Sequence, residues 1–132
     1  MNIYEEQVRK FYSEIWNRKN LRVIPQILHE DFEFRGSLGS ASRGHEGFIN
    51  YLQSIHSSLS GYQCIIEDIV IQPEKVFAKM TFTGVHVAEF MSYAATNKQI
   101  SWAGAALFTF SGEKIASLWV LGDLKGLESQ LN

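Results

Sequence analysis

The stretch GEKIASLWVLGDLKGLESQLN, residues 112–132, decides the fold that the chain adopts. Residues 115–121 have the apolar, β-branched and aromatic content of a buried strand, and Gly122 and Asp123 follow it directly. Side chains alternate along a strand, so Asp123 falls on the same face as Trp119 if no bulge intervenes. Its carboxylate either caps a following helix at the wet end of the strand or points into an apolar interior to do chemistry.

The composition predicts one globular domain spanning residues 1–132. Hydrophobic residues make up 45% and charged residues 20%, while the aromatic share of 13% suits a wide core or an apolar pocket. A formal net charge of −2 offers no basic patch for a phosphate backbone. We therefore do not expect nucleic acid as a partner.

Cysteine content and hydropathy narrow the class further. The single cysteine, Cys64, excludes an internal disulfide and a cysteine-rich zinc site. The first ten residues are too charged for a signal peptide, and no apolar run has membrane-spanning length. We expect a soluble, cytoplasmic protein with no membrane partner.

The first half of the chain is helical. Val8, Phe11, Tyr12, Ile15 and Trp16 form one apolar stripe at helical spacing, which predicts a first helix. Residues 21–28 predict a short second helix, residues 30–36 a brief strand, and residues 36–44 a flexible loop rich in Gly and Ser. The spacing of Phe48, Leu52, Ile55 and Leu59 predicts a third helix.

After Gly61 the period changes to that of strands, which we place at residues 62–71, 75–86, 99–110 and 114–122. Helices followed by long antiparallel strands predict an α+β domain with helices on one face of a curved sheet.

Parity along these strands predicts which residues share the pocket face. One row runs through Val76, Ala78, Met80, Phe82, Gly84 and His86, a second through Trp102, Gly104, Ala106, Phe108 and Phe110, and a third through Ile115, Ser117, Trp119, Leu121 and Asp123. His86 and Asp123 are the candidate polar groups on this face, and the small residues leave volume for a pocket. The alternatives are a helix-capping Asp123, a core or solvated His86, and tryptophans at 102 and 119 that simply fill the core.

Four segments carry a family resemblance: residues 8–21 (VRKFYSEIWNRKNL), 43–52 (RGHEGFINYL), 81–104 (TFTGVHVAEFMSYAATNKQISWAG) and 112–132. In this order they resemble the SnoaL-like polyketide cyclases of the NTF2-like superfamily. The resemblance implies a cone-shaped α+β barrel in which helices and a strongly bent, mostly antiparallel sheet enclose an apolar cavity. It also implies that Asp123 is the acid/base residue of an intramolecular aldol condensation, without cofactor or metal.

Such a condensation needs a base for a proton α to a carbonyl, donors for the enolate, and an acid for the alkoxide. Desolvation beside Trp119 would raise the pKa of Asp123 toward the working pH, and His86 could bond the carboxylate or polarise the carbonyl. Tyr12, Trp16 and Tyr51 are candidate donors, and Phe90, Trp102 and Trp119 complete the predicted ligand-binding set.

Three functions remain open at this point. The first is a cofactor-free cyclase or isomerase acting on a small apolar carbonyl compound, and the second is a hydrolase or dehydratase. The third is a non-catalytic module that binds a small hydrophobic ligand, which holds if Asp123 and His86 face no cavity. The resemblance and the aromatic content also predict a homodimer through the outer face of the sheet.

Overall fold

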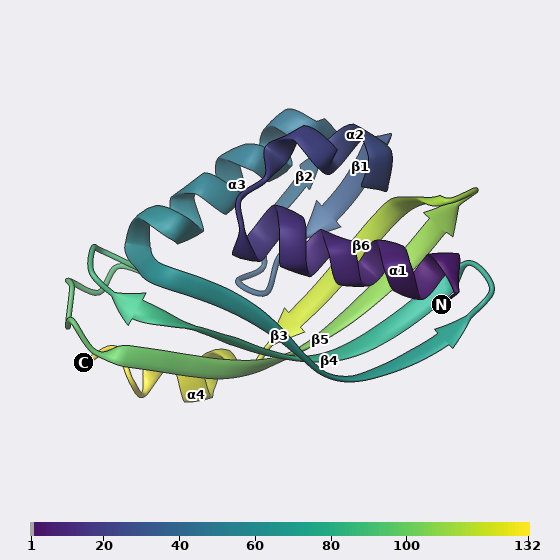
Figure 1. Cartoon of the computed structure of the whole chain (residues 1–132). Helices are drawn as coiled ribbons and strands as arrows, with labels where there is room; N and C mark the ends of the chain where they lie inside the picture. Colours follow the sequence, from purple (N-terminus) through teal and green to yellow (C-terminus); the bar gives the residue numbers. More distant parts are fainter. Residues whose placement is uncertain (1) are drawn as a thin grey trace.

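The computed structural model describes residues 2–132 and shows helices packed on one strongly curved sheet (Figure 1). The helical elements are α1 (Ile3–Lys10), the π-helical η1 (Phe11–Asn17), the 3₁₀ turn η2 (Leu21–Val23), α2 (Ile24–Ile27), α3 (Gly44–Ser58) and α4 (Leu124–Glu128). The strands are β1 (Leu28–Arg35), β2 (Ala41–Arg43), β3 (Leu59–Gln72), β4 (Lys75–His86), β5 (Gln99–Ser111) and β6 (Lys114–Gly122).

The predicted first helix is present as α1 and η1, which follow each other without a break. The Asn2 side chain accepts a hydrogen bond of 2.7 Å from the Tyr4 amide and so caps the helix start. The apolar stripe from Val8 to Trp16 is buried, as its spacing predicts. The Asn17 amide holds the end of η1 to β3 through both backbone groups of Cys64, at 3.1 and 2.7 Å.

The sheet has the strand order β2-β1-β6-β5-β4-β3, antiparallel throughout except for the parallel pair β1 and β6. Figure 1 shows α1, α2 and α3 over one side of this sheet, so the predicted α+β architecture is confirmed. The core lies between these layers, where Phe11, Phe32, Phe48 and Phe108 are fully buried.

One prediction about the first half of the chain is wrong. The segment 36–44 is not entirely a loop, because Ala41–Arg43 forms strand β2. These residues pair antiparallel with the end of β1, with Glu33 opposite Arg43 and Arg35 opposite Ala41. The pairing is a local hairpin, but a three-residue strand in a Gly/Ser-rich sequence has no apolar alternation that would predict it.

A bulge in β6 changes the faces of its side chains. Phe110 pairs with Ile115 and Thr109 pairs with Ser117, so Ala116 is an extra residue on β6. Beyond an extra residue, every following side chain moves to the other face of the sheet. Leu118 and Val120 are therefore buried at 2% and 4% exposure, whereas Trp119 and Leu121 are 47% and 49% exposed.

Candidate functional site

The inner rows of β4 and β5 lie as parity predicts. Val76, Ala78, Met80, Phe82, Gly84 and His86 on β4 are all buried, and so are Trp102, Ala106, Phe108 and Phe110 on β5. On β6 the inner row consists of Leu118 and Val120, and the predicted row through Trp119 is wrong because of the bulge at Ala116. The predicted inner rows of β4 and β5 are thus correct, and the predicted inner row of β6 is on the outer face.

Asp123 does not point into an apolar interior. The residue is exposed, and its Oδ1 accepts a hydrogen bond of 3.1 Å from the Gly126 amide at the start of α4. Its backbone amide continues the β5 ladder by donating to the Ala103 carbonyl at 2.9 Å. The carboxylate therefore has the geometry of a helix N-cap, the alternative that the sequence left open.

The space between the helices and the sheet is almost filled. A cavity of ≈ 20 Å³ remains there, lined by Tyr12, Trp16, Phe34, Ser37, Tyr51, Tyr62, Cys64, Phe82, Leu118 and Val120. That volume holds about one water molecule, whereas ligand sites of drug-sized molecules occupy roughly 300–1,000 Å³. Aromatic rings take up the rest: Trp16 lies 5.5 Å from Tyr62, and Phe82 lies 5.5 Å from Trp102, between ring centroids.

Three of the predicted ligand-binding residues, Tyr12, Trp16 and Tyr51, do meet at this cavity. The Tyr12 hydroxyl is buried with no hydrogen-bond partner among residues 2–132, and burial raises its pKa well above the ordinary value. Burial also raises the pKa of Tyr51 to about 12, against the opposing effect of hydrogen bonds with Ser37 and the Leu38 backbone. Both phenols are therefore neutral hydrogen-bond donors near pH 7.

Trp102 reaches the same region from β5. Its Nε1 is buried and has no hydrogen-bond partner in the part of the chain that the structure describes. A Cβ added to Gly122 would lie 3.2 Å from this nitrogen and 3.0 Å from Cβ of Ser37. Because Gly122 has no side chain, the indole N–H of Trp102 and Ser37 border the same small space.

His86 lies fully buried at the end of β4. Its Nδ1 accepts a hydrogen bond of 3.2 Å from the Thr96 amide and lies 3.0 Å from the Thr96 hydroxyl. An accepting Nδ1 places the proton of the neutral imidazole on Nε2, which is buried with no partner among the described residues. His86 is therefore a core histidine that presents an N–H donor, and it lies apart from Asp123, which caps α4.

Phe90 packs between two of these groups. Its ring centroid lies 6.2 Å from that of His86 and 6.1 Å from that of Trp102, and the side chain is 5% exposed. Ser37, Tyr62 and Phe82 belong to the same region, and sequence reasoning did not assign them to the site. The parity of β4 places Phe82 inward, but Ser37 sits in a loop whose sequence carries no positional signal.

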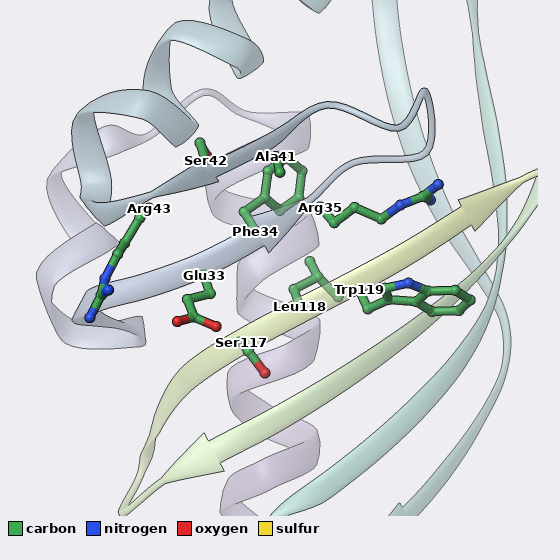
Figure 2. A pocket seen from close by; sticks show the side chains of 9 residues that line it. All are labelled: Glu33, Phe34, Arg35, Ala41, Ser42, Arg43, Ser117, Leu118 and Trp119. Carbon is green, nitrogen blue, oxygen red and sulfur yellow. The ribbon is translucent and has the colours of Figure 1, made fainter.

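A much larger hollow is an open groove of ≈ 620 Å³ over β1, β2 and β6 (Figure 2). Its polar and charged residues are Glu33, Arg35, Arg43, Ser42 and Ser117. Arg35 reaches toward Trp119, with its guanidinium carbon 5.7 Å from the indole centroid, and it also donates to the Val120 carbonyl. Trp119 therefore belongs to this groove, and its predicted place in the interior ligand set is wrong.

Phe34 and Leu118 line both the groove and the internal cavity and form the wall between them. The residues that line the internal cavity include hydroxyl, thiol and indole groups but, within the described chain, no carboxylate. Nor do three His, Cys, Asp or Glu side chains gather as metal ligands anywhere in residues 2–132. The interior thus offers neutral donors to a ligand's oxygen atoms.

No helix in the described part of the chain is both long and apolar enough to cross a membrane.

Comparisons with solved structures reproduce the fold over the whole chain. TsrD from Streptomyces laurentii is 23% identical, with a TM-score of 0.87 over 98% of this chain and 95% of that one. A SnoaL-like polyketide cyclase from Agrobacterium tumefaciens is 17% identical, with a TM-score of 0.84 over 100% of both chains. A search of curated proteins found no match.

The solved structures establish the fold only, and a sequence model of a protein family establishes the family. The model that describes the SnoaL-like polyketide cyclases matches residues 6–131, nearly the entire chain. Its match includes η1, the inner rows of the sheet and the Asp123 cap of α4. This chain therefore belongs to the SnoaL-like polyketide cyclase family.

Proposed function

We propose that the protein binds a small, largely apolar carbonyl compound in its interior and holds the carbonyl oxygen with neutral donors. Four buried side-chain polar atoms lack partners among residues 2–132, and three of them carry the proposal, Tyr12 OH, Trp102 Nε1 and His86 Nε2; the fourth, Ser42 Oγ, belongs to β2. A buried donor that makes no hydrogen bond costs about 1–3 kcal/mol. An oxygen acceptor from a ligand would remove that cost, while the aromatic walls would bury its apolar part.

Matched ligands test this proposal. Acetophenone and ethylbenzene have nearly the same shape, but acetophenone alone carries a carbonyl oxygen. We expect the protein to bind acetophenone about 2- to 10-fold more tightly, the effect of one hydrogen bond. The indole N–H signal of Trp102, assigned with Trp102→Phe, should move downfield in NMR spectra during the titration.

Two variants test which donors bind the carbonyl oxygen of acetophenone. Gly122→Ala puts a methyl group 3.2 Å from Trp102 Nε1 and should remove the preference for acetophenone. Tyr12→Phe removes the cavity hydroxyl that has no partner among residues 2–132 and should weaken this preference. Equal affinity for both ligands in the unaltered protein, with a stationary Trp102 signal, would contradict the proposal.

A second candidate is an acid/base enzyme that closes a ring by intramolecular aldol condensation with Asp123 as base. It is supported by family membership and by the position of Asp123 directly after Gly122, which borders Trp102 Nε1 and Ser37. To act, the carboxylate would have to leave its bond with the Gly126 amide and turn toward the carbonyl.

Exchange of the methyl protons of acetophenone with deuterium in D₂O separates the two candidates, because it measures removal of a proton α to the carbonyl. A base at Asp123 predicts accelerated exchange that falls roughly 10²–10⁴-fold in Asp123→Asn. Binding alone predicts the same exchange rate with and without the protein, whatever residue stands at 123.

We also propose that a second copy of the chain covers the outer face of the sheet. Val70, Phe77, Leu107 and Trp119 are directly opposite one another on four neighbouring strands, and all are 38–63% exposed. In the next row Ala105 lies between the exposed Lys79 and Leu121 on the neighbouring strands, so the apolar ladder is what a two-fold partner would cover. Exposed apolar patches of this kind mark interaction sites.

Light scattering tests the dimer. We expect a particle of twice the 15.0 kDa chain mass, and Leu107→Lys at the middle of the ladder should reduce it to a single chain. A monomer at micromolar concentration in the unaltered protein would refute this part of the proposal.

A further inference from the structure

The segment between β4 and β5, residues 87–98, carries Phe90 into the interior on a strained turn. Phe90 and Tyr93 exchange backbone hydrogen bonds of 3.0 and 2.9 Å. The two residues between them, Met91 and Ser92, have φ angles of 52° and 70°. Two positive φ angles in a two-residue turn suit Asn-Gly, whereas Met and Ser adopt them at a cost.

The base of the segment is firmly held by hydrogen bonds, including at Asn97, which also has a positive φ of 58°. The His86 amide donates to the Lys98 carbonyl at 2.9 Å, and the Asn97 amide donates to the His86 carbonyl at 2.8 Å. The Ser58 hydroxyl donates to the Glu89 carbonyl at 2.8 Å and ties the segment to the end of α3. Movement that releases strain is therefore movement of the turn that contains Phe90, Met91, Ser92 and Tyr93.

Phe90 packs against two side chains whose N–H donors make no hydrogen bond within residues 2–132. His86 Nε2 and Trp102 Nε1 are both buried, and the Phe90 ring lies about equally far from the two side chains, at 6.2 and 6.1 Å between ring centroids. A benzene ring in the place of the Phe90 ring would keep the same aromatic contacts. A carbonyl oxygen on that ring would add the acceptor that the donors need.

We infer that Phe90 is an internal plug, and that its withdrawal opens a site for an aryl ketone whose ring replaces the phenyl ring and whose oxygen accepts from His86 or Trp102. This inference rests on the proposed function and names its ligand class and point of entry. The strained turn lowers the free energy that opening requires.

Removal of the plug is the first test. In Phe90→Ala the site is open without any movement, so acetophenone should bind at least about 10-fold more tightly than in the unaltered protein, where only the open fraction can bind. The Trp102 indole signal should shift, and ethylbenzene should gain less affinity than acetophenone. Phe90→Leu, which removes less volume, serves the same comparison with a smaller gain if Phe90→Ala does not fold.

Relief of the strain is the second test and acts in the opposite direction. Met91→Asn with Ser92→Gly gives the turn its preferred residues and should hold Phe90 in place. We expect a higher melting temperature and weaker acetophenone binding, by about 3- to 10-fold. Unchanged acetophenone affinity in this variant and in Phe90→Ala, with a Trp102 shift in all three proteins, would refute the plug and leave the proposed function standing. Absence of acetophenone binding in all three would refute both.

Discussion

β5 and β6 are neighbouring strands of similar sequence character. Simple alternation of side chains predicts the buried face of β5 correctly but not that of β6. Along the inner face of β5 the alternation runs unbroken from Trp102 to Phe110. Along β6 a single extra residue, Ala116, moves Trp119 and Leu121 outward and Leu118 and Val120 inward. One bulge thus redirects the strand that leads to the candidate catalytic aspartate, which shows how little sequence is needed to move a site.

The largest expected effect is on stability, and it distinguishes the adjacent residues Leu118 and Trp119, which lie on opposite faces of β6. Leu118→Ala removes a side chain that is 2% exposed and should lower the free energy of unfolding by about 2–5 kcal/mol. The matched change Trp119→Ala, at 47% exposure, should cost far less in the isolated chain despite the larger side chain. Urea denaturation of both variants checks this, and a costlier Trp119→Ala would restore the face predicted from unbroken parity.

A smaller effect is expected on β5, where alternation holds. Gly104 faces inward, and a Cβ there would overlap the ring of Phe82. Gly104→Ala should therefore cost about 1–3 kcal/mol, because the ring must move within a packed core. Ala105→Leu, on the other face, is the control and should be nearly neutral for the stability of the isolated chain. Equal stabilities would mean that the Phe82 ring is free to move.

Substitutions at Asp123, at the end of β6, test whether this residue acts as a helix N-cap. As an N-cap it should tolerate Asp123→Asn with little loss of stability, whereas Asp123→Ala should cost about 0.5–2 kcal/mol. Melting temperatures of the two variants measure the cap, and the deuterium exchange of acetophenone measures any base. A stable Asp123→Ala protein would show that the bond to Gly126 contributes nothing.

The smallest effect concerns the buried phenols behind the inner face. The folded state holds the pKa of Tyr51 at about 12, while an unfolded tyrosine titrates near 10. Between these values the unfolded chain loses its proton first, so stability should fall as the pH rises above about 10. The loss due to Tyr51 should be just under about 1 kcal/mol at pH 10.5. Tyr51→Phe should flatten the dependence of the urea midpoint on pH, and an unchanged slope would show that Tyr51 is not its source.

Much of the interior could be predicted from alternation and helical spacing. The stripe from Val8 to Trp16 brings Tyr12 and Trp16 to the cavity, and the β4 row brings His86 into the core. Ser37 and β2 could not be predicted, because their Gly/Ser-rich segment has no apolar periodicity and their positions depend on pairing with β1 and on contact with Tyr51. The resemblance to the family found the fold, whereas alternation without a bulge placed Asp123 on the inner face, where the structure does not have it.

By itself the sequence determined the period of each element and therefore which residues of α1, η1, β4 and β5 are buried. Local periodicity is a property of the chain alone, because apolar spacing selects one face of a helix or strand. Only the tertiary structure decided the register of β6 against β5, and with it the faces of Trp119, Leu118 and Asp123. A bulge depends on the partner strand as much as on its own residues, so its position is settled when the two strands pair.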